Sequence, residues 1–254
     1  RLPGRPHLRG RVMNDAASRI AHRSSPAAVA ALSDTAAVRR ALDRGRAVVL
    51  PNPAPLTCVV AATGPAAVNT AKRRPAGQAV ALWAHHPDTL DRLDGLLDLD
   101  RDTRRFARRL LGEELVTLLV PVHDHLSVPA WLAPATLSGW TLLFGARWQP
   151  LAPLLDPFPV LYVSSANRTG GQPAATPADA AAVFAPDAPV LADPTGPAPP
   201  SGPAAPGRRA TTTVRLHPDG RAELHRHGAQ DGSHPGPGRY LRHLHRSYRD
   251  RGAP

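Results

Sequence analysis

Two short polar segments carry side chains suited to binding an anion. The first, Lys72-Arg73-Arg74-Pro75, contains the one lysine of the chain, and the second, Ser164-Ser165-Ala166-Asn167, runs into Arg168 and a pair of glycines. An ammonium group acts as a point charge on a phosphate, whereas a guanidinium group bonds two phosphate oxygens at once. Small polar side chains beside a glycine-rich turn leave backbone N–H groups free to approach an anion. Both segments therefore suit a phosphate-bearing ligand.

Each segment lies at the end of a predicted element of secondary structure. A helix is predicted over 64–73 and closes with the first segment, and a buried strand over 160–164 leads directly into the second. Open α/β sheets place ligands at the carboxyl ends of their strands, which favours a ligand site. Taken singly, the two segments also fit a basic helix end and an ordinary strand-to-helix loop.

Short apolar strands alternate with helices along the middle of the chain. Further helices are predicted after Asp34, over 88–99, over 102–111 and after a capping Thr176. Further strands are predicted at 47–50, 58–61, 79–83, 115–120, 140–144, 211–216 and 222–226. This alternation predicts an α/β fold, with one domain over 34–229 built on a twisted, mostly open mixed sheet flanked by helices.

Both ends of the chain differ from this middle part in composition. Residues 1–33 are rich in Arg, Pro, Ser and Ala without periodicity, and we expect them to form a mobile tail. Residues 230–254 begin with a Gly/Pro spacer and are predicted to form a basic tail. Within this second tail, Tyr240, Leu244 and Tyr248 repeat at helical spacing, which indicates a short amphipathic helix.

Composition limits the class of protein. The 254 residues include 31 Lys and Arg against 20 Asp and Glu, a net charge of +11 that would attract polyanions such as RNA. All but one of these cations are arginine, so a GC-rich codon bias explains the charge as well. No apolar run reaches the roughly 18 residues of a membrane span, and we expect a cytoplasmic protein without a membrane partner. The single cysteine excludes an internal disulfide and a cysteine-cluster metal site, and no residue is predicted as a metal ligand.

Four motifs in order along the chain carry a resemblance to a known family. They are K-x-R-P at 72–75, S-A-N at 165–167, T-T-V at 212–214 and R-H-G-A at 226–229. Over roughly 35–229 the sequence resembles the YrdC-like family, the L-threonylcarbamoyladenylate synthases. The resemblance implies a nucleotidyltransferase that condenses L-threonine, bicarbonate and ATP to threonylcarbamoyl-AMP and releases pyrophosphate. The product would serve a downstream transferase that makes threonylcarbamoyladenosine in tRNA.

The resemblance also implies roles for individual residues. Lys72 and Arg74 would hold the triphosphate of ATP, with Mg²⁺ bridging its oxygens. Ser165 and Asn167 would orient a phosphate or the carbamate through hydrogen bonds. Three further residues would contact the nucleotide: Thr212, Thr213 and Arg226.

The part of the motif that shapes the amino-acid pocket is altered. The family pattern P-T-(D/E)-T-x-(Y/F)-G corresponds here to Pro51-Asn-Pro-Ala-Pro-Leu-Thr57, so that Asn52 replaces a threonine and Leu56 an aromatic residue. The arginine usual near 143–145 is missing, and Arg147 lies closest to its place. We expect Asn52, Leu56 and Arg147 to contact the amino acid. The departures leave two alternatives open, a paralogue that uses another amine and a non-catalytic module that binds double-stranded RNA.

Overall fold

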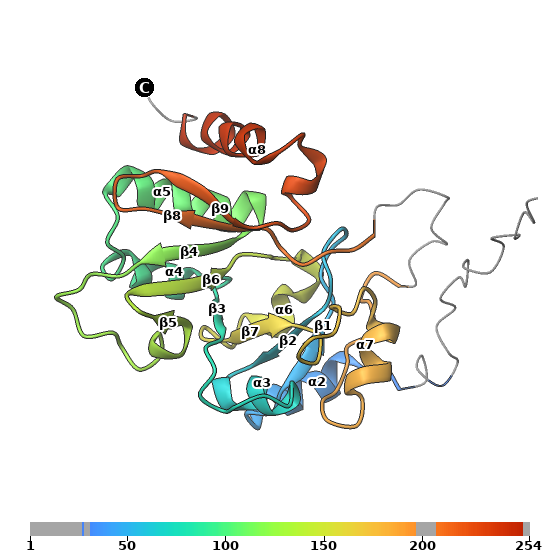
Figure 1. The fold of residues 1–254 in the computed structure, drawn as a ribbon. Coiled ribbons are helices and arrows are strands. Elements are labelled where there is room, and N and C mark those ends of the chain that lie inside the picture. Colours follow the sequence, from blue (N-terminus) through green and yellow to red (C-terminus); the bar gives the residue numbers. More distant parts are fainter. Residues whose placement is uncertain (1–26, 28–30, 197–206, 251–254) are drawn as a thin grey trace, which may run out of the picture.

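The structure is a computed structural model that describes residues 27, 31–196 and 207–250 (Figure 1). In these residues one mixed sheet has the strand order β1-β2-β7-β3-β6-β4-β8-β9, with β5 paired to β6 alone. The strands are β1 (Val48–Leu50), β2 (Val59–Ala62), β3 (Ala81–Trp83), β4 (Thr117–Pro121), β5 (Thr136–Leu137), β6 (Trp140–Phe144), β7 (Tyr162–Ser165), β8 (Thr213–Leu216) and β9 (Ala222–Arg226).

The sheet combines both kinds of strand pairing. β3 runs parallel to β6 and β4 runs parallel to β8, while the pairs that β7 forms with β2 and β3 are antiparallel. The sheet stays open, with β1 and β9 at its edges. The predicted α/β class with an open mixed sheet is confirmed.

Helices cover both faces of the sheet. The α-helices are α2 (Thr35–Asp43), α3 (Pro65–Ala71), α4 (Pro87–Asp94), α5 (Arg101–Arg109), α6 (Ala152–Leu155), α7 (Pro177–Phe184) and α8 (Pro237–Leu244). The short turns are η1 (Leu110–Glu114), η2 (Ala133–Ala135), η3 (Gln149–Leu151), η4 (Asp231–Ser233) and η5 (His245–Arg249). The predicted caps Asp34 and Thr176 both accept a hydrogen bond from the first helical turn that follows them.

The hydrophobic core has two parts, one on each face. Because side chains alternate along a strand, Val49 packs into one part while its neighbours Val48 and Leu50 pack into the other. Apolar residues of α3, α4, α5, α7 and α8 fill the first part, and those of α2 and α6 fill the second. The face with fewer helices leaves room above the centre of the sheet, and the candidate site lies there.

The C-terminal segment differs from the predicted tail. Residues 230–250 turn through η4 into α8 and η5, and Tyr240 and Leu244 of α8 are fully buried. The hydroxyl groups of Tyr240 and Tyr248 donate to the carboxylate of Glu114 at 3.0 and 2.7 Å. The segment after residue 229 therefore packs against the rest of the described chain, and it contains the amphipathic helix predicted from the tyrosine and leucine spacing.

The N-terminal expectation concerns mainly residues outside the described part. Within that part, the backbone N–H of Ser33 donates to the carbonyl of Val190 at 2.7 Å, so Ser33 pairs with the segment that follows α7. None of the helices that the structure describes has the length and apolar character needed to cross a membrane.

Candidate anion-binding site

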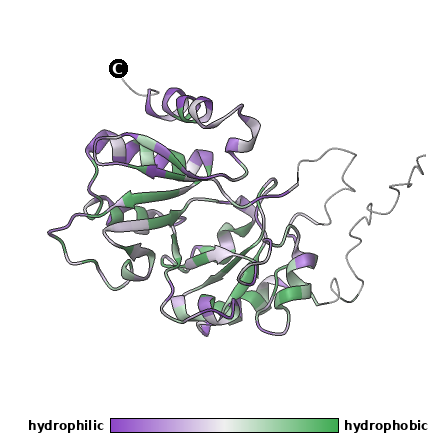
Figure 2. Cartoon of the chain, viewed as in Figure 1, coloured by the Kyte–Doolittle hydropathy of each residue, from purple (hydrophilic) through white to green (hydrophobic). Residues whose placement is uncertain are grey.

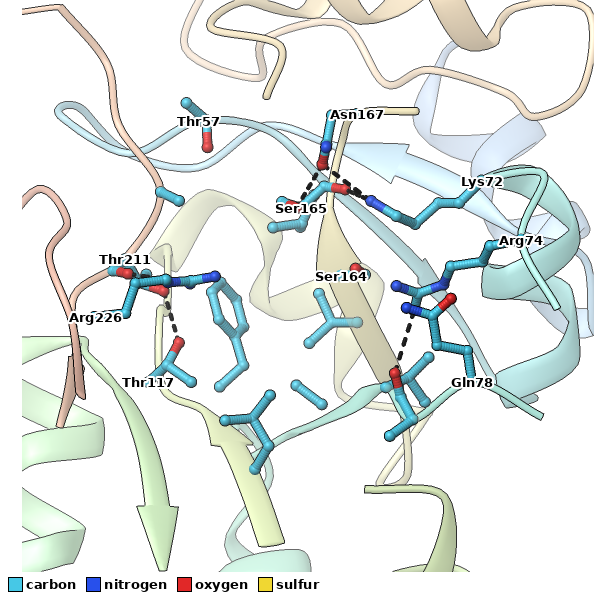
Figure 3. Close-up of a pocket in the computed structure, with 18 of the residues that line it drawn as sticks. Thr57, Lys72, Arg74, Gln78, Thr117, Ser164, Ser165, Asn167, Thr211 and Arg226 are labelled. Carbon is cyan, nitrogen blue, oxygen red and sulfur yellow. Dashed lines mark hydrogen bonds between the residues drawn. The ribbon is translucent and has the colours of Figure 1, made fainter. Parts of the chain in front are cut away.

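A cavity of about 390 Å³ lies over the centre of the sheet, and the sheet itself forms its floor (Figure 3). The floor is apolar and comes from side chains that four neighbouring strands direct to the same face: Val59, Ala81, Leu142, Phe144 and Val163. Polar side chains from loops and strand ends surround this floor. A cavity of this size, apolar with a few convergent polar groups, is typical of a small-molecule site.

Two segments separated by more than 90 residues meet at one side of the cavity. Lys72, at the carboxyl end of α3, donates through Nζ to Oδ1 of Asn167 at 3.0 Å and to the backbone carbonyl of Ser165. Ser165 donates its hydroxyl to the same Oδ1 at 2.6 Å, and all three residues line the cavity. The sequence-based expectation that these side chains come together is confirmed. With Arg74, we call them the cationic wall.

Burial sets the charge state of Lys72. Its residue is only 3% exposed, and this burial is the largest cause of a pKa lowered from 10.5 to about 7. The positive charges of Arg74 and Arg168 contribute the smaller part of the same shift. A nearby anion would have the opposite effect, because it favours the charged form. Lys72 is thus poised to take up a proton when an anion binds.

Arg74 is held in place by a buried residue that the sequence did not single out. Asn69, in α3, accepts a hydrogen bond from Nε of Arg74 at 2.5 Å and donates to the carbonyls of Ala76 and Gln78 at 2.7 and 2.8 Å. It is fully buried. The one signal in the sequence is a poor helix former, asparagine, at a core-facing position of a short helix. Asn69 fixes both the guanidinium of Arg74 and the turn that follows.

The middle residue of the basic run points elsewhere. Arg73 has φ of 53°, and its guanidinium pairs with Asp187 at 3.2 Å. Arg168 bonds the same carboxylate and the carbonyls of Ala71 and Val183, which ties α3 to α7. Only Lys72 and Arg74 of the basic run therefore reach the cavity.

Arg226 lines the opposite side of the cavity, at the end of β9 (Figure 3). Its guanidinium donates to the carbonyl of Thr211 at 3.3 Å, and the hydroxyls of Thr211 and Thr117 lie 2.6 Å apart. The R-H-G-A motif requires glycine at position 228 for a steric reason. A Cβ on Gly228 would lie 2.2 Å from the backbone nitrogen of Thr212.

Thr212 and Thr213, which we expected to contact the nucleotide, do not line the cavity. The hydroxyl of Thr212 donates to Asp231 at 2.6 Å in a fully buried network. Thr213 lies in β8 between Thr117 and Arg226, and these register partners line the cavity in its place. The expected pair is thus off by one to two residues, and Thr211, which precedes β8, is the threonine that reaches the site.

The altered loop over residues 51–57 forms another side of the cavity, which we call the acceptor wall. Asn52, Leu56 and Thr57 line it, as expected for the first two. The amide of Asn52 donates to the carbonyl of Thr57 at 2.8 Å, and Arg208 donates to the carbonyls of Asn52 and Leu56. Arg147 does not join them, because its guanidinium donates to the carbonyl of Ala84 at 3.0 Å outside the cavity.

The lining includes three cations, Lys72, Arg74 and Arg226, and no carboxylate among the described residues. Nor do the described residues elsewhere form a cluster of three or more His, Cys, Asp or Glu that fits a metal ion. These side chains do not fit a magnesium ion held by the protein, which would need carboxylate oxygens. The same side chains do suit an extended anion that carries its own bound metal ion into the cavity.

Comparisons with known proteins agree with this arrangement at the level of the fold. No protein-family model matches the sequence, and no curated protein matches it. Among solved structures, the chain is similar to a double variant of Sua5 from P. abyssi, with 15% identity, a TM-score of 0.52, 75% of this chain covered and 55% of that one. The chain thus spans about half the length of that protein.

Two further structures have comparable similarity. E. coli YciO has 13% identity and a TM-score of 0.53, with 75% of this chain and 86% of that chain covered. Full-length HypF in a phosphate- and nucleotide-bound form has 12% identity and a TM-score of 0.52, with 78% and 24% covered. With its open mixed sheet and these structural neighbours, the chain has the Sua5/YrdC fold.

Proposed function

We propose that this protein binds ATP in the cavity and transfers its adenylyl group to a carbamate formed from bicarbonate and the amine of an amino acid. L-threonine is the first candidate for that amino acid, because the K-x-R-P and S-A-N motifs resemble those of threonylcarbamoyladenylate synthases. The observation that carries the proposal is the set of three cations around one cavity whose described lining has no carboxylate. HypF, of whose chain 24% matches this protein, was solved in a phosphate- and nucleotide-bound form, which is consistent with the proposal.

The reaction needs no covalent help from the protein. The amine attacks the carbon of bicarbonate, a carbon–nitrogen bond forms, and water leaves to give a carbamate. A carbamate oxygen then attacks the α-phosphorus of ATP, the bond to the β-phosphate oxygen breaks, and pyrophosphate leaves with its electron pair. Charge on the phosphates and the position of the attacking oxygen govern the rate of such a step.

The cationic wall is suited to neutralising the charge on the phosphates. Lys72 and Arg74 extend from one turn and would neutralise the phosphate chain, and the hydroxyl of Ser165 would turn from Asn167 to one of the phosphate oxygens or to the carbamate. Asn167, whose amide N–H groups donate to the carbonyls of Arg168 and Gly171, would act by positioning Lys72 and Ser165 through Oδ1. Arg226 faces them from the other side and would meet a second anionic group. Magnesium enters as the ion that the nucleotide carries, since the described lining lacks carboxylates.

A second candidate keeps the chemistry and changes the amine. The acceptor wall favours it, because Leu56 is apolar and the amide of Asn52 is committed to its own loop. An amino acid with an apolar side chain would fit this wall better than one with a hydroxyl group. Pyrophosphate release measured across the common amino acids separates the two candidates.

The test of the proposed function compares two neighbouring basic residues, of which only one lines the cavity. Lys72→Ala removes a charge-assisted contact, which we expect to weaken Mg·ATP binding by about tenfold to a hundredfold and to abolish pyrophosphate release. Arg73→Ala removes the adjacent charge, whose side chain is 70% exposed and pairs with Asp187. Titration calorimetry for ATP and a pyrophosphate assay with bicarbonate and each amine provide the readouts.

We expect Arg73→Ala to bind ATP within about threefold of the unaltered protein. Equal losses in the two variants would show that net charge rather than the cavity binds ATP. ATP binding that depends on Lys72 but gives no pyrophosphate with any amine would exclude the transfer reaction and leave a nucleotide-binding protein.

A further inference from the structure

One face of the sheet is left open beyond the cavity. In the described protein, the part of the hydrophobic core that α2 and α6 fill contains no residue of β4, β8 or β9. Two large side chains on this face, Leu119 of β4 and Trp140 of β6, are half-buried and belong to neither part of the core. Figure 2 shows that β4 is mostly hydrophobic, whereas β9 at the sheet edge is mostly hydrophilic. Contiguous apolar surface that stays open is typical of a binding groove.

The strand register joins this open surface to the floor of the cavity. Residues paired across neighbouring strands point to the same face, and Val163 pairs with Ala81 while Leu142 pairs with Leu119. Of these four residues, all but Leu119 line the cavity. Trp140 lies two residues before Leu142 in β6 and therefore points to the same face. The floor thus continues past Leu142 onto Leu119 and Trp140, and we call these three residues the apolar strip.

A guanidinium group lies at the far end of the apolar strip. Arg215, the register partner of Leu119, has its guanidinium carbon 5.0 Å from the centre of the Trp140 ring. Its Nε is buried and has no hydrogen-bond partner among the described residues. A buried donor without a partner costs free energy, which a ligand can recover by supplying an acceptor. The π face of an aromatic ring accepts an N–H group and also stacks on a guanidinium group.

The apolar strip begins where the resemblance to the family predicts a polar residue. An arginine is expected near 143–145 beside the amino acid, and the nearest arginine, Arg147, lies outside the cavity. The strand presents Leu142 and Phe144 to the floor instead, and Leu56 of the acceptor wall is apolar as well. A charged side chain of the acceptor would lack polar partners over this floor. The observed side chains suit an apolar one.

The distance between the S-A-N segment and the apolar strip favours a long side chain. β3 lies between β7, which carries Ser165, and β6, which carries Leu142, so about two strand spacings or about 10 Å separate them. At about 1.5 Å per bond, threonine extends about 3 to 4 Å from its nitrogen to its last side-chain atom and phenylalanine about 6 to 7 Å. With its carbamate held at Ser165, an aromatic amino acid would reach the strip, whereas threonine would end above β3.

We propose that the amine acceptor is an aromatic amino acid whose ring lies on the apolar strip and meets Arg215 at its far end. This inference rests on the proposed function and selects its second candidate, an amine other than threonine. Binding covers the half-exposed side chains of the strip, and burial of this apolar surface is the source of affinity. Contact with the Trp140 ring and the guanidinium group favours a flat ring over a branched aliphatic side chain.

The first test measures pyrophosphate release from Mg·ATP and bicarbonate with phenylalanine, tyrosine, tryptophan, leucine and threonine. We expect kcat/KM for the best aromatic amino acid to exceed that for leucine by at least about threefold and that for threonine by at least about tenfold. Fastest release with threonine or leucine would overturn this inference and leave the transfer reaction standing. Release with none of the common amino acids would instead count against the proposed function.

Two tryptophan variants locate the ring of the acceptor. Trp140→Ala removes one side of the apolar strip, and we expect the KM for the best aromatic amine to rise about tenfold while the Kd for Mg·ATP stays within about twofold. Trp131→Ala is the matched control, because Trp131 is also half-buried and also lies under a guanidinium group, that of Arg92 at 4.2 Å, but packs against the other part of the core. It should change neither constant by more than about twofold. Trp140→Phe retains a ring and should restore most of the affinity.

Fluorine NMR with para-fluorophenylalanine gives a readout that needs no turnover. With Mg·ATP and bicarbonate present, the fluorine resonance should shift in the unaltered protein and in Trp131→Ala, and stay at its free position in Trp140→Ala. Such binding without pyrophosphate release would overturn the proposed function and retain the aromatic subsite. An unshifted resonance in the unaltered protein would overturn the inference. So would a weaker affinity for Mg·ATP in Trp140→Ala alone, because the strip would then bind the nucleotide base.

Discussion

The cationic wall and the acceptor wall hold their polar side chains in different ways. In the cationic wall, Lys72, Ser165 and Asn167 bond one another across the cavity edge, and Arg74 is fixed by Asn69. In the acceptor wall, Asn52 turns its amide to the backbone of its own loop, and Leu56 offers only carbon atoms. The first wall is preorganised for one kind of charge, whereas the second combines the apolar side chain of Leu56 with the hydroxyl group of Thr57.

This difference indicates which wall of the site tolerates a change of side chain. A charged group buried among like charges must be held by several bonds at once, so a change there disturbs the others. An apolar side chain at the edge of a cavity can change size with a cost confined to one contact. The two walls therefore make opposite predictions for mutation.

The largest effect is expected where the cationic wall is supported from behind. Asn69→Ala leaves Arg74 without its acceptor at 2.5 Å, so the guanidinium is no longer held toward the cavity. We expect ATP affinity to fall by about thirtyfold, the value of one charge-assisted contact between Arg74 and a phosphate. Calorimetry of ATP binding and the unfolding temperature are measured together. Thr89→Val, which removes a buried hydroxyl bonded to Pro159 away from the cavity, is the control for stability alone. Equal losses of ATP affinity in both variants would show that Asn69 acts only through stability.

An effect of similar total size, spread over a range of pH, is expected from the titration of Lys72. The free protein holds Lys72 with a pKa of about 7, lowered mainly by burial, and a bound polyphosphate would raise this pKa. Binding then takes up a proton above pH 7, so ATP affinity should fall by about tenfold per pH unit between about pH 7.5 and 9, where the phosphates are already ionised. The Lys72→Ala variant should show no such slope. An affinity that is constant over this range in the unaltered protein would contradict the assigned role of the ammonium group.

The smallest effect is expected at the acceptor wall. Leu56→Ala enlarges this side of the cavity, and we expect the KM for the preferred amine to rise about threefold to tenfold while the Kd for ATP changes less than about twofold. Steady-state pyrophosphate release over a series of amino acids gives the first value and calorimetry the second. Parallel changes in both constants would mean that Leu56 contacts the nucleotide, and the division into two walls would not hold.

The sequence predicts the local parts of this fold well. The caps Asp34 and Thr176 and the strand over 140–144 depend on neighbours within a few residues, and these appear as expected. The pairing of Lys72 with Asn167 has no local signal, and only the order of the motifs, through their resemblance to a family, placed both segments at one site.

Three errors have a common physical origin. Thr212 in place of Thr211 is a shift of one residue, and such a shift turns a side chain from the cavity to the interior. The role of Asn69 depends on the turn after α3, in which Arg73 has a positive φ and Arg74 donates to Asn69. The docked C-terminal helix depends on Glu114, which lies 126 residues before Tyr240 and in a π-helical turn that the sequence does not signal. In each case the deciding contact is distant or depends on exact register.

The position of β7 has a consequence for how the protein is made. β2 and β3 are close in the sequence, but β7 separates them in the sheet and comes much later in the chain, after β4, β5 and β6. Until residues 162–165 leave the ribosome, both earlier strands have an unpaired edge, and pairing of such distant segments is slow. The ligand cavity, whose floor and cationic wall both include β7, thus forms late in biosynthesis. Until then the unpaired edges of β2 and β3 in the nascent chain are exposed to incorrect strand pairing.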